Sequence, residues 1–98
     1  MIVNLIKAEQ MFSLTLPDKK KGQYWLTDID ENGEYREIIS IEAIDNRWVV
    51  KSNKLVTVLD SNNNPIGSAV LEPSGFLSLK YYNSNERIII YSESIDPS

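Results

Sequence analysis

Short runs of β-branched and aromatic residues, separated by turn residues, dominate this chain from Gly22 to Ser92. Such runs are typical of β-strands, and the Gly, Pro, Asn and Asp residues between them are typical of turns. Their spacing of roughly 8–12 residues predicts a β-sandwich or barrel rather than alternating strands and helices. We predict strands over residues 1–6, 11–16, 23–27, 35–44, 47–51, 55–59, 66–71, 76–82 and 87–92.

Residues 35–44 also carry a helical signal, because Glu37, Glu42 and Ala43 favour helices. Three isoleucines within four positions, Ile38, Ile39 and Ile41, argue for a strand, since their branched side chains are stiff at χ1. Neither a Gly nor a helix C-cap follows. We therefore predict a strand here.

Length and composition indicate one globular domain. The chain has 98 residues, 42% of them hydrophobic, so a single core is expected, with a domain over residues 1–95 and a tail or linker over 96–98. The net charge is −4 and the basic run at residues 19–21 lies beside Asp18, which argues against a nucleic-acid partner. The absence of Cys fits a reducing compartment, and the apolar stretch at residues 1–6 is too short for a signal-peptide core or a membrane span.

Residues 28–33 match the first half of a calcium-binding EF-hand loop, with Asp28, Asp30 and Asn32 as candidate oxygen ligands. The second half does not match, because Arg36 and Ile39 occupy positions where ligands are needed. Asp, Asn and Gly are also the residues that turns prefer. We predict a turn and no bound metal.

The sequence shows no catalytic constellation, since it contains neither His nor Cys. The acids of the 28–33 turn are expected to be fully hydrated, and two hydrated carboxylates do not supply an acid and a base. Arg36, Arg47 and Arg87 each lie near an acid in sequence and are expected to be solvated. We therefore predict no catalytic residue and no cofactor.

The aromatic residues suggest a second class of function, a carbohydrate- or polymer-binding sandwich. In residues 23–27, Tyr24 and Leu26 share one face and Trp25 lies on the other, while Tyr82 lies opposite Tyr81. Trp25 and Tyr82 are thus the candidates for an exposed groove. The other aromatics are expected mostly in the core, namely Tyr24, Trp48, Phe76, Tyr81 and Tyr91.

Five segments, in order, resemble a forkhead-associated (FHA) domain: residues 22–26, 39–43, 48–50, 55–58 and 71–79. The resemblance covers most of the chain and lies in spacing and strand character. It implies an antiparallel β-sandwich of FHA type with about 9–11 short strands. It also implies that loops at residues 28–33, 39–43 and 52–54 converge at one end of the sandwich.

The chain departs from the FHA pattern where that family binds phosphothreonine. The family's Arg position falls within residues 26–28, Ala43 stands at the His position after Ser40, and Lys54 follows Asn53 where the family has Gly. A bidentate Arg supplies strong contacts to a phosphate, and Asp28 and Asp30 would repel one. The resemblance therefore implies a degenerate domain that no longer selects phosphopeptides.

Such degenerate domains resemble the N-terminal modules of FtsK/SpoIIIE-type ATPases of type VII secretion systems in Gram-positive bacteria. That resemblance implies a regulatory protein–protein interaction module in the cytoplasm, at the inner face of the plasma membrane, with other secretion components as partners. The candidate interaction residues are Trp25, Asp28, Asp30, Asn32, Ser40 and Asn53.

Overall fold

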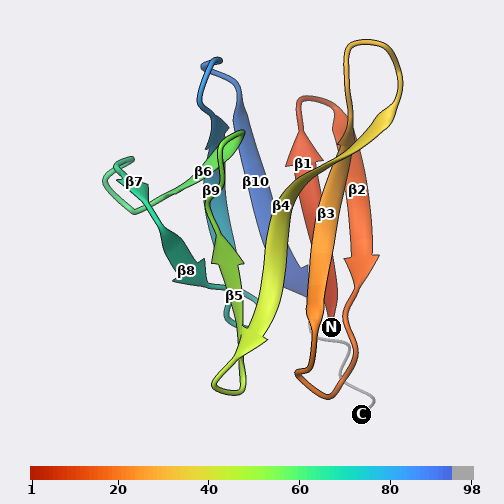
Figure 1. Cartoon of the computed structure of the whole chain (residues 1–98), viewed down its shortest axis with the longest axis vertical. Coiled ribbons are helices and arrows are strands. Elements are labelled where there is room, and N and C mark those ends of the chain that lie inside the picture. The colour runs from red at the N-terminus through yellow and green to blue at the C-terminus, as the bar shows by residue number, and fades with distance from the viewer. Residues whose placement is uncertain (94–98) are drawn as a thin grey trace.

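Two antiparallel sheets pack face to face in the computed structural model of the chain, which describes residues 1–93 (Figure 1). The six-stranded sheet has the order β2-β1-β10-β9-β6-β7, and the four-stranded sheet has the order β3-β4-β5-β8. The predicted all-β sandwich is thus confirmed, and the ten strands found within residues 1–93 agree with the predicted number of about 9–11. The strands are β1 Ile2–Lys7, β2 Gln10–Thr15, β3 Gln23–Ile29, β4 Tyr35–Ile44, β5 Arg47–Lys51, β6 Val56–Leu59, β7 Pro65–Ile66, β8 Ser68–Val70, β9 Phe76–Tyr81 and β10 Arg87–Glu93.

The core lies between the two sheets and follows the alternation of side chains along each strand. In the six-stranded sheet, Val3 and Leu5 of β1 lie beside Ile88 and Ile90 of β10, and all four are fully buried. The four-stranded sheet contributes side chains from β3, β4 and β5, including Leu26, Ile39, Ile41, Trp48 and Val50. One apolar layer therefore joins the two sheets.

Most predicted strands agree with the structure, including the strand at residues 35–44, where helix was the rival. The segment 66–71 is the clear exception, because it forms two short strands that belong to different sheets. β7 pairs with β6, while β8 pairs with β5, so the chain crosses between the sheets at Gly67. The predicted tail at residues 96–98 and the boundary at residue 95 lie outside the described residues.

Phe76 corrects a second prediction, since it was expected in the core but is 70% exposed. Leu79 and Tyr81 are buried on the inner face of β9, so the alternation places Phe76 on the outer face. Trp48 and Tyr81 are buried as predicted, whereas Tyr91 is half-buried on the outer face of β10. Trp25 and Tyr82, the candidates for a groove, are exposed.

Four connections meet at one end of the sandwich, which we call the loop end (Figure 1). They are the β1–β2 turn, the β3–β4 turn, the β5–β6 loop and the β9–β10 loop, at residues 8–9, 30–34, 52–55 and 82–86. Lys7, at the end of β1, also lies here. Within residues 1–93, no helix is long and apolar enough to cross a membrane.

Candidate functional site

A β-bulge between β3 and β4 decides which side chains face inward at the loop end. Leu26 pairs with Ile39 but Thr27 pairs with Glu37, so Ile38 is the extra residue. Without the bulge, strict alternation would place Glu37 opposite Asp28. With it, Arg36 is the partner of Asp28. The bulge thus puts a cation, and not a second acid, beside this carboxylate.

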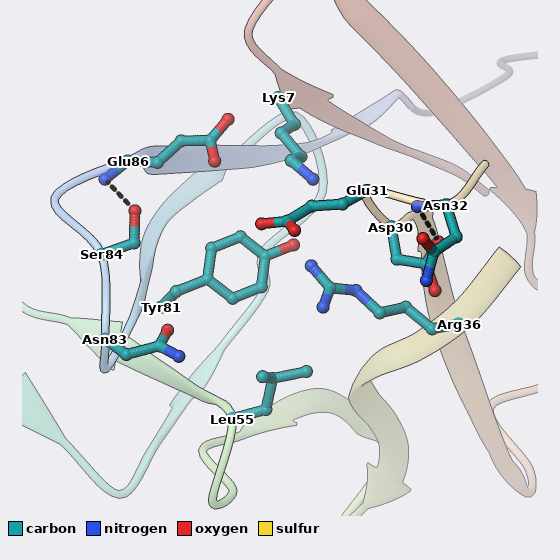
Figure 2. Close-up of a pocket in the computed structure, with 10 residues that line it drawn as sticks. All are labelled: Lys7, Asp30, Glu31, Asn32, Arg36, Leu55, Tyr81, Asn83, Ser84 and Glu86. Atoms are coloured by element: carbon teal, nitrogen blue, oxygen red, sulfur yellow. Dashed lines mark hydrogen bonds between the residues drawn. The ribbon is translucent and has the colours of Figure 1, made fainter. Parts of the chain in front are cut away.

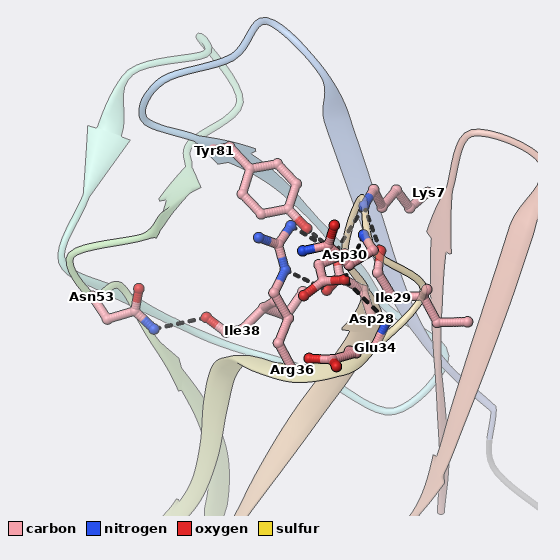
Figure 3. Close-up of polar contacts among 10 residues, drawn as sticks. Lys7, Asp28, Ile29, Asp30, Glu34, Arg36, Ile38, Asn53 and Tyr81 are labelled. Carbon is pink, nitrogen blue, oxygen red and sulfur yellow. Dashed lines mark hydrogen bonds and ion pairs between the residues drawn. The ribbon is translucent and has the colours of Figure 1, made fainter.

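Asp28 is fully buried, and its carboxylate accepts hydrogen bonds from three side chains (Figure 3). Arg36 donates twice, from Nε to Oδ1 over 2.7 Å and from Nη2 to Oδ2 over 3.3 Å. Lys7 Nζ donates to Oδ2 over 2.9 Å, and the Tyr81 hydroxyl also donates to Oδ2. The prediction of a hydrated Asp28 was therefore wrong, and Arg36, which was expected to be solvated, is partly exposed but bound to this buried carboxylate.

We call Lys7, Asp28, Arg36 and Tyr81 the Asp28 cluster. Its members come from β1, β3, β4 and β9, so the cluster joins both sheets. The Tyr81 ring lies close to both cations, with Lys7 Nζ 5.4 Å and Arg36 Cζ 5.0 Å from its centroid. These distances are within the range in which a cation is attracted to an aromatic ring.

The cluster holds its members in fixed charge states. Burial by itself would raise the pKa of Asp28, but the hydrogen bonds from Arg36, Tyr81 and Lys7 outweigh burial and lower that pKa below its ordinary value. Burial raises the pKa of Tyr81, and its hydrogen bond to Asp28 adds to this effect. At neutral pH the cluster therefore contains an ionised carboxylate and a neutral phenol.

The two cations respond in the opposite sense to desolvation. Burial is the largest single effect on Lys7 and would by itself lower its pKa, but the hydrogen bond to Asp28 and the attraction of nearby negative groups together outweigh burial, so that this pKa is raised. The hydrogen bond to Asp28 likewise raises the pKa of Arg36. None of these shifts brings a group toward neutral pH, so the cluster is poorly suited to moving a proton.

A polar hollow of about 490 Å³ opens above the cluster at the loop end. Figure 2 shows Lys7, Arg36, Glu31 and the Tyr81 hydroxyl directed toward its centre. Lys7 and Arg36 are both bound to the carboxylate of Asp28. Three further carboxylates, those of Asp30, Glu31 and Glu86, line the hollow around these two cations. The lining consists of Lys7, Asp30, Glu31, Asn32, Arg36, Leu55, Tyr81, Asn83, Ser84 and Glu86.

The turn that resembles half an EF-hand is held by hydrogen bonds between one of its own side chains and its backbone. Asp30 Oδ1 accepts hydrogen bonds from the backbone N–H groups of Asn32 and Glu34, over 2.9 and 3.0 Å. Gly33 takes a positive φ of 79°, which Gly adopts without strain. Asp28 lies within β3 and points into the protein, so the turn is shorter than predicted.

A second loop repeats this arrangement, although Pro65 stands where an EF-hand loop needs Gly. There Asp60 Oδ1 accepts from the backbone N–H groups of Asn62 and Asn64, over 2.8 and 2.9 Å. In both loops the Asp at the start of the turn accepts backbone hydrogen bonds that hold the turn, so its presence is explained without a bound metal ion. In the described part of the chain, no group of three acidic side chains is arranged to hold a metal ion.

The remaining predicted site residues do not gather at the hollow. Trp25 and Ser40 are cross-strand partners on β3 and β4, and Ser40 is buried, so residues 39–43 form the middle of a strand and not a loop. Asn53 lies at the loop end, where its Nδ2 donates to the carbonyl of Ile38 over 2.7 Å. Its Oδ1 accepts from the backbone N–H groups of Leu55 and Val56.

The predicted loop convergence is therefore correct for two of three segments. The β3–β4 turn lines the hollow with residues 30–32, and the β5–β6 loop lines it with Leu55. Residues 39–43 do not line it. Sequence reasoning also missed Lys7, Tyr81 and the β9–β10 loop, which complete the site. Comparison of the chain with protein-family models, with curated proteins and with solved structures finds no match.

Proposed function

We propose that this domain is a non-enzymatic interaction module that binds a positively charged segment of a partner protein at the loop-end hollow. The observation that carries the proposal is the charge balance there. Both cations are already bound to Asp28, and the carboxylates of Asp30, Glu31 and Glu86 remain around them. A basic side chain would find acceptors in this hollow.

The same balance argues against recognition of phosphate. A phosphate would have to compete with Asp28 for Arg36, which already makes a bidentate contact. It would also approach three further carboxylates. Repulsion of this kind disfavours the wrong partner more strongly than a missing contact does.

The proposed cellular role rests on the FHA resemblance of the sequence. As a degenerate FHA domain, the module would belong to an FtsK/SpoIIIE-type ATPase of a type VII secretion system and would lie in the cytoplasm at the inner face of the plasma membrane. Its partner would be another component of that system. The two-sheet architecture is compatible with this assignment.

Carbohydrate binding has weaker support. Trp25 lies on the four-stranded sheet, while Tyr82 follows β9 of the six-stranded sheet, so the two candidate rings do not share a sheet. Tyr24 and Trp48 do form an edge-to-face pair, with centroids 5.8 Å apart, but Trp48 is buried. Sugar-binding surfaces need rings that water can reach.

A peptide titration followed by amide NMR tests the proposal. A lysine- and arginine-rich peptide should shift the amide signals of residues 30–32 and 83–86, and added salt should weaken the effect. A glutamate-rich peptide of equal length should leave those signals in place. Equal binding of the two peptides, or shifts confined to the opposite end of the sandwich, would contradict the proposal.

Two substitutions of equal charge change provide the control. Glu31→Gln removes a carboxylate from the hollow and should weaken binding of the basic peptide. Asp18→Asn changes the net charge equally in the exposed β2–β3 connection, at the other end of β3, and should leave binding unchanged. Equal losses in both variants would indicate attraction by net charge alone.

A further inference from the structure

An apolar patch lies on the outer face of the six-stranded sheet. Ile6 of β1 has Met11 of β2 and Ile89 of β10 as cross-strand partners, and all three are exposed. Phe76 of β9, 70% exposed, is the partner of Tyr91 in β10. We call Ile6, Met11, Phe76, Ile89 and Tyr91 the outer patch.

The outer patch is continuous across four neighbouring strands. The Tyr91 hydroxyl lies 3.8 Å from Met11 Sδ, although β1 separates their strands. Between these two strands, Asn4 of β1 is the cross-strand partner of both Tyr91 and Ser13. Asn4 is buried, although it lies on this outer face. Contiguous exposed patches of large apolar residues commonly mark interaction sites in soluble proteins.

The outer face of β10 is charged at both ends and apolar between them. Its side chains there are, in order, Arg87, Ile89, Tyr91 and Glu93. Arg87 and Glu93 are both exposed. A strand with this order is complementary to an antiparallel copy of itself, because each charge then meets its opposite.

We propose that the outer patch is a self-association surface, on which two copies of this chain pack face to face. They are related by a two-fold axis that lies between the two faces, parallel to both sheets and perpendicular to β10. The axis passes between Ile89 and Tyr91, so that Arg87 of each copy lies opposite Glu93 of the second copy. A two-fold interface makes every such contact twice. The surface is separate from the loop-end hollow, so the inference goes beyond the proposed function.

The same axis also matches large side chains to small ones. On β9, Phe76 would lie opposite Ser78 of the second copy, and on β2, Met11 would lie opposite Ser13. On β9 and β2 a bulky side chain then meets a short one, while Ile89 packs on Tyr91 of the second copy, and both arrangements allow close packing of the two faces. Charge and size therefore select the same orientation.

Sedimentation velocity over a concentration series tests the proposal. The wild-type chain should pass from monomer to dimer as its concentration rises. Phe76→Lys places a charge in the patch and should raise the dimer dissociation constant by about tenfold or more. The matched control is Tyr35→Lys, because Tyr35 is 73% exposed but lies on the four-stranded sheet. It should leave the dissociation constant unchanged.

Charge reversal at the ends of β10 tests the orientation. Arg87→Glu and Glu93→Arg should each weaken the dimer, because like charges would then face each other. The double variant should restore it, and a mixture of the two single variants should form a heterodimer. A wild-type chain that stays monomeric, a dimer insensitive to Phe76→Lys, or a double variant weaker than both single ones would each overturn the proposal.

Discussion

Asp28 and Arg36 face each other across β3 and β4, and the guanidinium Nε lies 2.7 Å from Oδ1 of the carboxylate. The contact depends on the bulge at Ile38, which changes the partner of Asp28 from Glu37 to Arg36. A local irregularity of the backbone within the four-stranded sheet thereby gives the buried carboxylate its arginine partner, so that the arginine at the candidate binding site is already ion-paired.

Acid should destabilise the fold through Asp28. Its pKa is lowered in the folded state, so its ionisation contributes stability above the unfolded value of about 3.9, and this contribution is lost as the pH falls through the folded pKa. The difference in unfolding free energy between wild type and Asp28→Asn should therefore shrink below about pH 4. Urea denaturation at several pH values measures it, and a difference independent of pH would contradict this account.

Arg36 should matter far more for stability than Arg47. Arg36→Leu leaves the buried carboxylate with only Lys7 and Tyr81, and breaking a buried ion pair should cost about 3 kcal/mol. Arg47 is exposed at the start of β5, so Arg47→Leu should cost under about 0.5 kcal/mol. Equilibrium denaturation compares the two, and equal losses would mean that the Asp28 cluster is not stabilising.

The strands could be predicted because short runs of β-branched and aromatic residues are separated by turn residues, and buried side chains recur at every second position within several of these runs. Val3 and Leu5 follow this period, as do Ile88 and Ile90. The Asp28–Arg36 contact could not be predicted by the same rule, because the rule assumes an unbroken register. The consecutive isoleucines at 38 and 39 are both buried at the bulge, but Ile88 and Ile89 are also consecutive and pair in regular register, so this pattern does not by itself specify a bulge.

Phe76 illustrates a different limit of sequence reasoning. Its aromatic side chain suggests the core, but the phase set by Leu79 and Tyr81 turns it outward. The residues that complete the hollow, such as Lys7 and Tyr81, lie far from Asp28 in sequence. Their approach depends on which strands neighbour each other, and local patterns do not specify that order.

The two tryptophans should differ sharply in their effect on stability. Trp48 is 2% exposed, so Trp48→Ala should cost roughly 3–5 kcal/mol, the usual cost of truncating a buried Trp. Trp25 is exposed, and Trp25→Ala should cost under about 1 kcal/mol. Denaturation of both variants checks this prediction, and a larger loss for Trp25→Ala would mean that the faces of β3 are assigned incorrectly.

Millimolar Ca²⁺ should leave the melting temperature unchanged. Asp28 is occupied by three donors, and Asp30 Oδ1 accepts backbone N–H groups within its turn, so the turn cannot supply the roughly six to eight oxygen ligands that Ca²⁺ takes. Weak binding stabilises a fold very little by mass action. Differential scanning fluorimetry with and without Ca²⁺ tests this, and an increase of several degrees would show that the turn binds the ion.

The most direct test of the central claim is a comparison of phosphothreonine peptides with their unphosphorylated forms. Because Asp28 occupies Arg36 and Lys7, and further carboxylates line the hollow, a peptide array and calorimetric titrations should show no preference for the phosphorylated form. Selective micromolar binding of phosphothreonine, abolished by Arg36→Leu, would contradict the claim that this site recognises its partner without phosphate.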